Sequence, residues 1–290
     1  MAAEPDPGPF RLDRPARQSV PFLFASPHSG RHYPAGLLEK TRLDPTTLRR
    51  SEDAFVDELF AGVVGLGAPL LAAQFPRAYL DVNRSSTELD AAMFDAPLGL
   101  PVDAPSPRVT AGLGVIPRIV RDGAEIYRGK LGAREADARI TQLYQPYHRA
   151  LAALMEEIHG RFGVAVLVDC HSMPSALSVP DIVLGDRYGA SAAPALTARA
   201  EAAFSREGFS LARNTPYAGG HSTALHGKVA SGFHALQVEV NRALYLDEEK
   251  IVKRPAFELV RERLTRALKT IVTMPLSQLG RPDCLPQAAE

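Results

Sequence analysis

The residues best able to do chemistry follow directly after short apolar runs. His171 comes after the run at 164–168, next to Asp169, and His28 comes after the run at 21–25. Apolar, β-branched runs of this length are typical of strands buried in a sheet, and open α/β sheets bind ligands at the carboxyl ends of their strands. Imidazole nitrogens placed there could hold a catalytic zinc ion. For either histidine alone, a hydrogen bond to a backbone carbonyl is the alternative role.

Acidic residues could supply a third metal ligand and a general base. Glu52 and Asp53 precede an apolar helical pattern, where they either complement the positive helix start or direct one carboxylate to the metal. We expect Asp53 to lie nearer the histidines, because helix residues about 100° apart cannot both face one point. Glu239 lies within the apolar run at 234–240, so it either answers a cation such as Arg242 or faces a site. We favour the site.

Other kinds of active site receive less support. The chain has no HExxH motif, which excludes a thermolysin-like helix site, and no GxSxG elbow of a serine hydrolase. Cys170 precedes His171 on one predicted strand, where adjacent side chains point to opposite faces, so we expect Cys170 to pack in the core. His32 lies past Gly30, away from the strand end, so we favour His28 as the ligand.

Arginines and glycines near other strand ends could bind a substrate. Asn83 and Arg84 follow an apolar run at 78–82, and Arg77 precedes it. The planar guanidinium binds carboxylates through two parallel hydrogen bonds, although a surface ion pair is the commoner use of arginine. The turn at 214–221 is rich in glycine, which lets backbone approach a ligand closely. Neither a phosphate loop nor a dinucleotide fingerprint accompanies it, so no nucleotide is implied.

The elements that must position these residues alternate between strands and helices. We expect strands at 21–25, 69–73, 78–82, 164–168, 182–184 and 234–240, and helices at about 55–64, 134–162, 191–206 and 255–270. Pro146 should kink or break the long helix. The Pro- and Gly-rich loop at 91–126 is long enough to cover a site. This pattern predicts an α/β fold in one catalytic domain over residues 1–290, with flexible or surface-wrapped tails at about 1–18 and 279–290.

Composition limits the partners and the location. Lys plus Arg number 33 and Asp plus Glu number 33, so no net charge attracts nucleic acid or an anionic membrane. The first ten residues do not resemble a signal peptide, and the longest apolar run, 59–73, is broken by Gly and Pro. With only Cys170 and Cys284, a disulfide framework is implausible. We expect a cytoplasmic monomer or small homo-oligomer without nucleic-acid or membrane partners.

Six motifs in a fixed order resemble one family over residues 21 to about 247. They lie at 26–30 (SPHSG), 51–53 (SED), 81–84 (DVNR), 169–172 (DCHS), 216–220 (PYAGG) and 237–239 (QVE). Together they resemble the N-formylglutamate amidohydrolases, or N-formylglutamate deformylases, a family similar in fold to zinc carboxypeptidases and aspartoacylase. The resemblance implies a three-layer α/β/α fold of the phosphorylase/hydrolase-like kind, with a central mixed, largely parallel sheet. It also implies Zn²⁺, or another divalent metal, on His28, His171 and Asp53 or Glu52.

The implied activity is metal-dependent hydrolysis of N-formyl-L-glutamate, or a similar N-acyl acidic amino acid, to formate and L-glutamate in histidine degradation. Glu239 would be the general base, Arg77 would stabilise the oxyanion, and Asn83 and Arg84 would orient the substrate α-carboxylate. The remaining candidates for substrate binding are Tyr217, Gly219, Gly220, His221 and Gln237. The alternatives are another N-acyl amino acid deacylase, a carboxypeptidase-like hydrolase, or a metal-free binding protein on the same fold.

Overall fold

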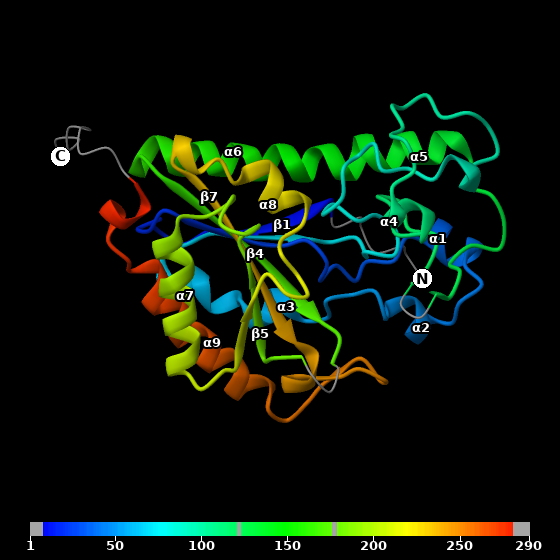
Figure 1. Cartoon of the computed structure of the whole chain (residues 1–290). Coiled ribbons are helices and arrows are strands. Elements are labelled where there is room, and N and C mark those ends of the chain that lie inside the picture. Colours follow the sequence, from blue (N-terminus) through cyan, green and yellow to red (C-terminus); the bar gives the residue numbers. More distant parts are fainter. Residues whose placement is uncertain (1–7, 121–122, 176–178, 281–290) are drawn as a thin grey trace.

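A seven-stranded sheet between two layers of helices forms the centre of the molecule (Figure 1). The structure is a computed structural model that describes residues 8–120, 123–175 and 179–280. The strand order is β1-β3-β2-β4-β7-β5-β6, with antiparallel pairing at β1–β3 and β5–β7 and parallel pairing elsewhere. The strands are β1 Phe10–Asp13, β2 Phe22–Ser26, β3 Leu70–Ala73, β4 Ala165–Met173, β5 Ile182–Gly185, β6 Leu211–Arg213 and β7 Phe233–Asn241. The predicted three-layer α/β class with a mixed, largely parallel sheet is confirmed.

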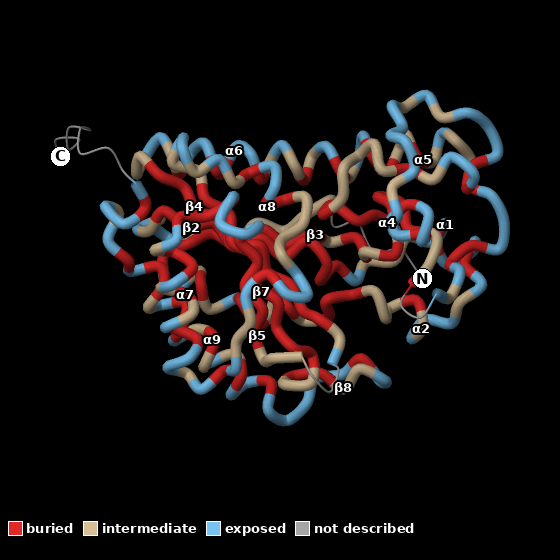
Figure 2. Tube along the Cα trace, viewed as in Figure 1, coloured by how far each residue is buried: buried red, intermediate tan, exposed pale blue. Residues whose placement is uncertain are grey.

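Each face of the sheet packs against its own helices. The face that includes Phe24 and Val166 packs against α3, α7 and α9, whereas the face that includes Leu23 and Leu167 packs against α6. Alternate side chains of a strand point to opposite faces, so the apolar residues with which β2 and β4 begin contribute to both cores. Figure 2 shows this buried centre in red beneath the exposed outer faces of the helices.

The helices and short elements that surround the sheet are as follows. The helices are α1 Ala35–Lys40, α2 Pro45–Arg49, α3 Val56–Leu59, α4 Pro107–Thr110, α5 Ala133–Arg139, α6 Gln145–Phe162, α7 Pro194–Arg206, α8 His221–His226 and α9 Phe257–Val272. Short helical turns are η1 Ala61–Leu66, η2 Ala91–Met93, η4 Ile140–Tyr144, η5 Val229–Ser231, η6 Arg242–Leu244 and η7 Leu276–Leu279, and β8 Leu246–Asp247 pairs with β9 Val252–Lys253. No helix in these described segments is both long enough and apolar enough to cross a membrane.

The predicted strand at 78–82 is wrong. The chain turns there instead, because the amides of Tyr79 and Leu80 donate to the carbonyl of Pro76 at 2.9 and 3.2 Å. The amide of Asp81 donates to Val115 at 2.8 Å, outside the sheet. Leu80 and Val82 are nevertheless buried in the core on the α6 side. Burial under a helix produced the apolar pattern that had suggested a strand.

The predicted helices differ in detail from the observed ones. Residues 55–64 form the four-residue α3 followed by the 3₁₀ turn η1, because Gly62 and Gly65 weaken a continuous α-helix. The long helix at 134–162 is interrupted by a π-helical turn, η4, directly before Pro146, whose missing N–H cannot complete a regular turn. The strand β1 lies within the expected N-terminal tail, and β6, β8 and β9 were not predicted. Residues 1–7 and 281–290 of the expected tails lie outside the described residues.

Candidate active site

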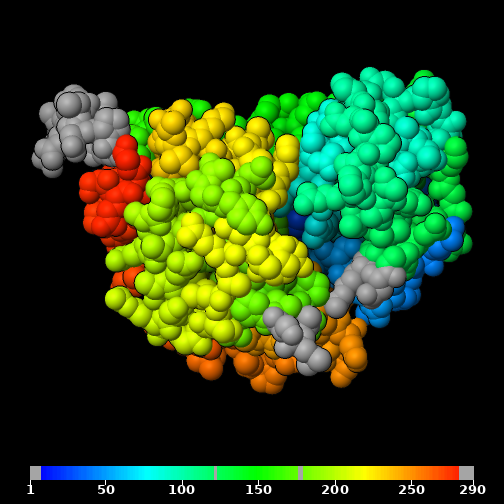
Figure 3. All heavy atoms as spheres, viewed as in Figure 1, coloured from blue at the N-terminus to red at the C-terminus, as the bar shows by residue number. Residues whose placement is uncertain are grey.

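A cavity of about 540 Å³ opens at the carboxyl ends of β2, β4 and β7. Its volume falls in the range of roughly 300–1,000 Å³ that is typical of small-molecule sites. Figure 3 shows the hollow between the cyan-green part of the chain and the yellow part, which carries the turn at 214–220. The loop at 91–126, expected to cover a site, contributes Arg108, Leu113, Gly114, Pro117 and Ile119 to the wall.

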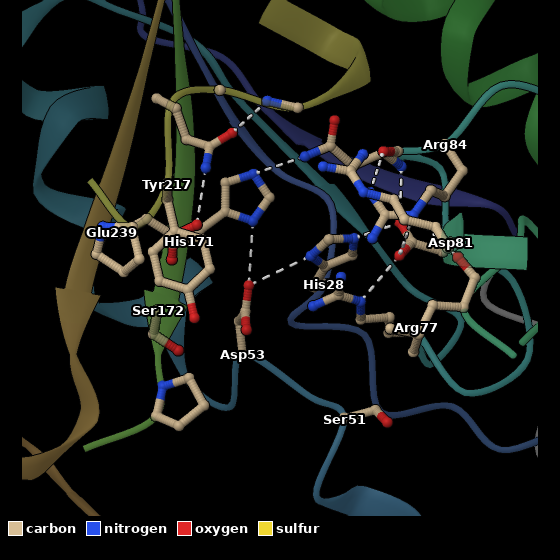
Figure 4. A pocket seen from close by; sticks show the side chains of 18 of the residues that line it. His28, Ser51, Asp53, Arg77, Asp81, Arg84, His171, Ser172, Tyr217 and Glu239 are labelled. Atoms are coloured by element: carbon tan, nitrogen blue, oxygen red, sulfur yellow. Dashed lines mark hydrogen bonds and ion pairs between the residues drawn. The ribbon is translucent and has the colours of Figure 1, made fainter. Parts of the chain in front are cut away.

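Three predicted metal-ligand residues meet at the base of this cavity. The Oδ2 atom of Asp53 lies 3.3 Å from Nδ1 of His28 and 3.1 Å from Nδ1 of His171 (Figure 4). One ligand atom from each residue lies within 4.8 Å of the other two, and all three residues are buried. Strand pairing aligns the ends of β2 and β4, and the amide of Asp53 donates to the carbonyl of His28 at 3.0 Å. The fold therefore brings together residues far apart in the sequence.

The other nitrogen of each imidazole contacts a second carboxylate. Nε2 of His28 lies 2.7 Å from Oδ1 of Asp81, and Nε2 of His171 lies 2.9 Å from Oδ2 of Asp169. A carboxylate at one ring nitrogen holds the proton there and turns the other nitrogen's lone pair outward, as around many metal ions. Without a cation, the imidazoles donate hydrogen bonds to Oδ2 of Asp53. Once their Nδ1 atoms are deprotonated, as metal binding requires, two lone pairs would face Oδ2 of Asp53, which is also an acceptor. This donor set fits a divalent cation.

The charges around the triad favour a cation as well. Burial alone would lower the pKa of His171, but Asp169 and Asp53 outweigh it and raise that pKa well above its usual value. Burial would raise the pKa of Asp53, but hydrogen bonds from His171 and His28, together with the charges of His28 and Arg242, hold it well below its usual range. The carboxylate is therefore ionised at neutral pH and attracts positive charge.

Arg242 binds the outer oxygen of the same carboxylate. Its Nη2 atom lies 2.8 Å from Oδ1 of Asp53, and its Nε atom donates to Oγ of Ser172 at 3.1 Å. The sequence left open whether Arg242 answers Glu239. It pairs with Asp53 instead, which leaves Oδ2 of that residue for the two histidines.

Glu239 faces the cavity beside the triad. It is 6% exposed, is paired in register with His171 across β4 and β7, and accepts a hydrogen bond from Nε2 of Gln237 at 2.8 Å. Among the described residues, no Lys, Arg or His lies within ion-pair distance of its carboxylate. Burial raises the pKa of Glu239 to about 7. A carboxylate with such a pKa can both accept and release a proton near neutrality.

The glycine-rich turn holds Glu239 in place through Gln237. The amide of Gly220 donates to Oε1 of Gln237 at 2.8 Å, and Gln237 donates in turn to Glu239. A Cβ atom on Gly220 would lie 2.4 Å from Nδ2 of Asn83, so only glycine fits. The close packing at Gly220 is thus against a side chain of the protein, and the predicted approach of this turn to a ligand stays a prediction.

The predicted cations line the cavity. Arg77 Nε donates to Oδ2 of Asp81 at 2.9 Å. Arg84 donates to the carbonyls of Leu113 and Asn83 at 3.1 and 3.2 Å, and burial lowers its pKa. The nearest acid to its Nε atom is Asp81, at 3.9 Å. Arg84 is thus placed to receive an anionic ligand.

The side chain of Asn83 is already engaged by the protein. Its Oδ1 atom accepts from the amide of Ser222 at 2.9 Å, and its Nδ2 atom lies 3.4 Å from Oδ2 of Asp169. Asn83 also lines the cavity, beside the backbone of Gly219 and Gly220.

Two other candidates lie away from the triad. Glu52, the alternative to Asp53, accepts from Tyr33 at 2.6 Å and from Arg49 at 3.0 Å, so it does not reach the histidines. Within the described part of the chain, His221 does not line the cavity, and its Nε2 atom lies 3.2 Å from the hydroxyl of Tyr144.

Tyr217 lies at the cavity, whereas Cys170 lies in the hydrophobic core. Tyr217 is 37% exposed, and its ring lies beside Glu239 at the cavity wall (Figure 4). Cys170 is packed in the core on the α9 side, as expected, while Cys284 lies outside the described residues.

Sequence reasoning assigned no role to Asp81, Asp169 or Arg242 in holding the ligands. A usable signal was present at 169–171, since residues two apart on a strand share a face and an acid there can reach the histidine ring. Asp81 and Arg242 gave no such signal, because they reach the triad from a turn and from the residue after β7.

Comparison with a family model identifies the relationship. Residues 20–246 match the model of the N-formylglutamate amidohydrolases. An N-formylglutamate deformylase of Pseudomonas aeruginosa is 33% identical over 246 residues, which are 80% of this chain and 85% of the relative. One of Pseudomonas putida is 28% identical over 242 residues, 79% of this chain and 83% of the relative.

A solved structure agrees with these relatives. The N-formylglutamate amidohydrolase of Ralstonia eutropha JMP134 superimposes with a TM-score of 0.85 at 36% identity, covering 91% of this chain and 96% of that one. A gene product of Agrobacterium tumefaciens shares the fold, with a TM-score of 0.60 at 19% identity over 91% of this chain and 96% of its own. The chain therefore belongs to the N-formylglutamate amidohydrolase family.

Proposed function

We propose that this protein is an amidohydrolase that hydrolyses N-formyl-L-glutamate, or a close N-acyl acidic amino acid, to formate and L-glutamate. The observation that carries the proposal is the position of Asp53 Oδ2 between the Nδ1 atoms of His28 and His171. Glu239, whose carboxylate forms no ion pair with a described residue, lies beside them. The names of the relatives, N-formylglutamate deformylase and N-formylglutamate amidohydrolase, are the reason for proposing a formyl group and glutamate as the two parts of the substrate.

His28, Asp53 and His171 would hold the metal ion, and Zn²⁺ suits two imidazoles and one carboxylate best. When bound, such an ion polarises the amide carbonyl and makes water more acidic. Asp81 and Asp169 would keep the imidazoles oriented toward it.

Glu239 would move the proton in this reaction. It would take a proton from the attacking water as the new C–O bond forms at the formyl carbon, and give it to the amide nitrogen as the C–N bond breaks. Arg77 would stabilise the negative oxygen that develops on that carbon. Arg84, whose Nη1 atom donates to the carbonyl of Asn83, would bind the substrate α-carboxylate.

The finer physiological assignments belong to the same proposal. The resemblance to the family suggests a step in histidine degradation, and the two cysteines fit a reducing cytoplasm. We also propose that the protein is a monomer or a small homo-oligomer and that its substrate is a small molecule.

Formate release tests the proposal directly. We expect purified protein to release formate from N-formyl-L-glutamate faster than it releases the acyl groups of N-acetyl- and N-succinyl-L-glutamate. Chelation, checked by elemental analysis, should abolish the activity, and Zn²⁺ should restore it. Full activity in protein shown to be free of metal would contradict the metal role, and a preference for an acetyl or succinyl group would contradict the formyl assignment.

A further inference from the structure

One arginine of the cavity wall has a guanidinium without a partner among the described residues. Arg108 lies in α4 and lines the cavity, yet within the described segments its guanidinium makes no hydrogen bond or ion pair. Arg77 and Arg242 also line the cavity, but they bind Asp81 and Asp53. Arg108 therefore offers its full charge to a ligand.

The backbone beneath this side chain is held firmly. Oγ of Ser106 caps α4 by accepting from the amide of Val109 at 3.2 Å, and Val109 is buried. The amide of Leu113 donates to the carbonyl of Arg108 at 2.9 Å. The base of the side chain is thus fixed while the guanidinium stays available.

Arg108 is connected to Arg84 through Leu113. The carbonyl of Leu113 accepts from Nε of Arg84 at 3.1 Å, and its amide binds Arg108 as described. Burial and the charges of Arg77 and Arg108 both lower the pKa of Arg84, with the charge of Asp81 acting against them. Like charges at this wall favour a ligand that carries two negative groups.

The two arginines lie at different depths. Arg84 is 3.9 Å from Asp81, whose other oxygen contacts His28, so Arg84 is close to the triad. Arg84 is partly buried whereas Arg108 is exposed, so Arg108 lies nearer the surface. In an N-acylglutamate, the side-chain carboxylate is two methylene groups farther from the amide than the α-carboxylate. We propose that Arg108 binds the side-chain carboxylate of the substrate and gives the cavity its preference for acidic amino acids, an inference that rests on the proposed function.

A pair of substrates and one substitution test this role. N-formyl-L-glutamine has nearly the size of N-formyl-L-glutamate but lacks the second charge. Arg108→Ala should lower kcat/KM on N-formyl-L-glutamate about 10- to 100-fold, mostly through KM, as expected for loss of a charged hydrogen bond, and should change kcat/KM on N-formyl-L-glutamine at most about twofold. Arg134→Ala, which removes an exposed arginine of α5, is the matched control and should change neither value. Equal losses on both substrates, or no loss on either, would overturn the assignment.

Binding without turnover separates this inference from the proposed reaction. Calorimetry should show that the wild-type protein binds glutarate, a five-carbon dicarboxylate, about 10- to 100-fold more tightly than the monocarboxylate pentanoate, and that Arg108→Ala loses this difference. If the wild-type protein shows the difference but hydrolyses no N-formyl amino acid, the proposed function fails and the role of Arg108 stands. If glutarate binds no better than pentanoate, or binds equally to both proteins, the role of Arg108 fails whatever the activity.

Discussion

Two clusters of histidines in the described part of this molecule have different surroundings. In the first, His28 and His171 each have a carboxylate at both ring nitrogens. The second consists of His148 on α6 and His226 on α8. In it, His148 donates to the carbonyl of Val82 at 2.9 Å. In the parts of the chain that the structure describes, Nδ1 of His148 and Nε2 of His226 have no hydrogen-bond partner.

The pKa values follow from these partners. Burial lowers the pKa of both His148 and His226 to about 4, whereas the carboxylates raise that of His171 despite its burial. Burial is common to both clusters, so the acids make the difference. In this protein, among the described histidines of the two clusters, carboxylates contact both ring nitrogens only in the cluster for which we propose a metal ion.

Removing one histidine from each cluster should give the largest contrast. We expect His171→Ala to lose the bound metal and to lose turnover by more than the roughly 10⁴-fold that loss of a base can cost. His148→Ala should keep one metal ion per chain and most of its turnover. Elemental analysis and formate release on the same preparations measure both. Metal lost from His148→Ala but kept by His171→Ala would reverse the comparison.

Loss of the proposed general base, Glu239, should have the next largest effect. Glu239→Gln keeps the shape of the side chain, so we expect a folded, metal-loaded protein whose turnover is about two to four orders of magnitude lower. Glu52→Gln makes the same change at a buried glutamate held by Tyr33 and Arg49, and should cost stability but little turnover. A metal-loaded, fully active Glu239→Gln protein would remove Glu239 from the mechanism.

The carboxylates behind the imidazoles should matter less than the ligands themselves. Asp169→Asn removes the charge at Nε2 of His171, and we expect metal affinity to fall about 10- to 100-fold. Asp57→Asn changes another buried aspartate, which pairs with Arg31, and should leave metal affinity unchanged. Competition with a chromophoric chelator measures both. Equal affinities in Asp169→Asn and wild type would show that the acids do not distinguish the clusters.

The smallest expected effect concerns the second cluster, that of His148 and His226. The pKa of His226 is about 4 in the folded protein and about 6.5 when unfolded, so the unfolded chain binds more protons between these values. Its contribution to stability, at most about 3 kcal/mol, is present above pH 6.5 and is lost as the pH falls toward 4.

Denaturant unfolding at several pH values measures this effect. We expect His226→Gln to lose less stability than the wild-type protein between pH 7 and pH 5. His32→Gln, outside both clusters, should keep the wild-type slope. The prediction fails if His226→Gln and wild type lose stability in parallel.

The sequence predicted which candidate residues lie close together better than it predicted the segments around them. Apolar runs that end in polar residues pointed to His28 and His171, and an acid within a third apolar run pointed to Glu239. The structure brings all three to one sheet edge, because parallel strands in register align their carboxyl ends. We expected Asp53 nearer the histidines than Glu52, and the structure places Asp53 at both histidines. Both acids precede α3, so the helical spacing from which we argued is not the reason. The roles of these residues remain proposals.

What the sequence could not predict depends on tertiary contacts. The run at 78–82 is apolar because it packs under α6, and propensity cannot distinguish that from a strand. His221 has the chemistry of a ligand-binding residue, but contacts with Tyr144 hold it away from the cavity. The partner of Arg242 depended on which segment crosses the end of β7, a long-range packing outcome.

The order of strands in the sheet has a consequence for how the protein is made. Asp53 and His171 are 118 positions apart, and β2 finds its neighbour β4 only after both are synthesised. Pairings between such distant segments form slowly, since a long loop must close first. While the chain emerges from the ribosome, His28 and Asp53 are therefore synthesised well before His171. We expect metal uptake to begin only once β4 has docked, so that a metal-sensitive signal would time a late stage of folding.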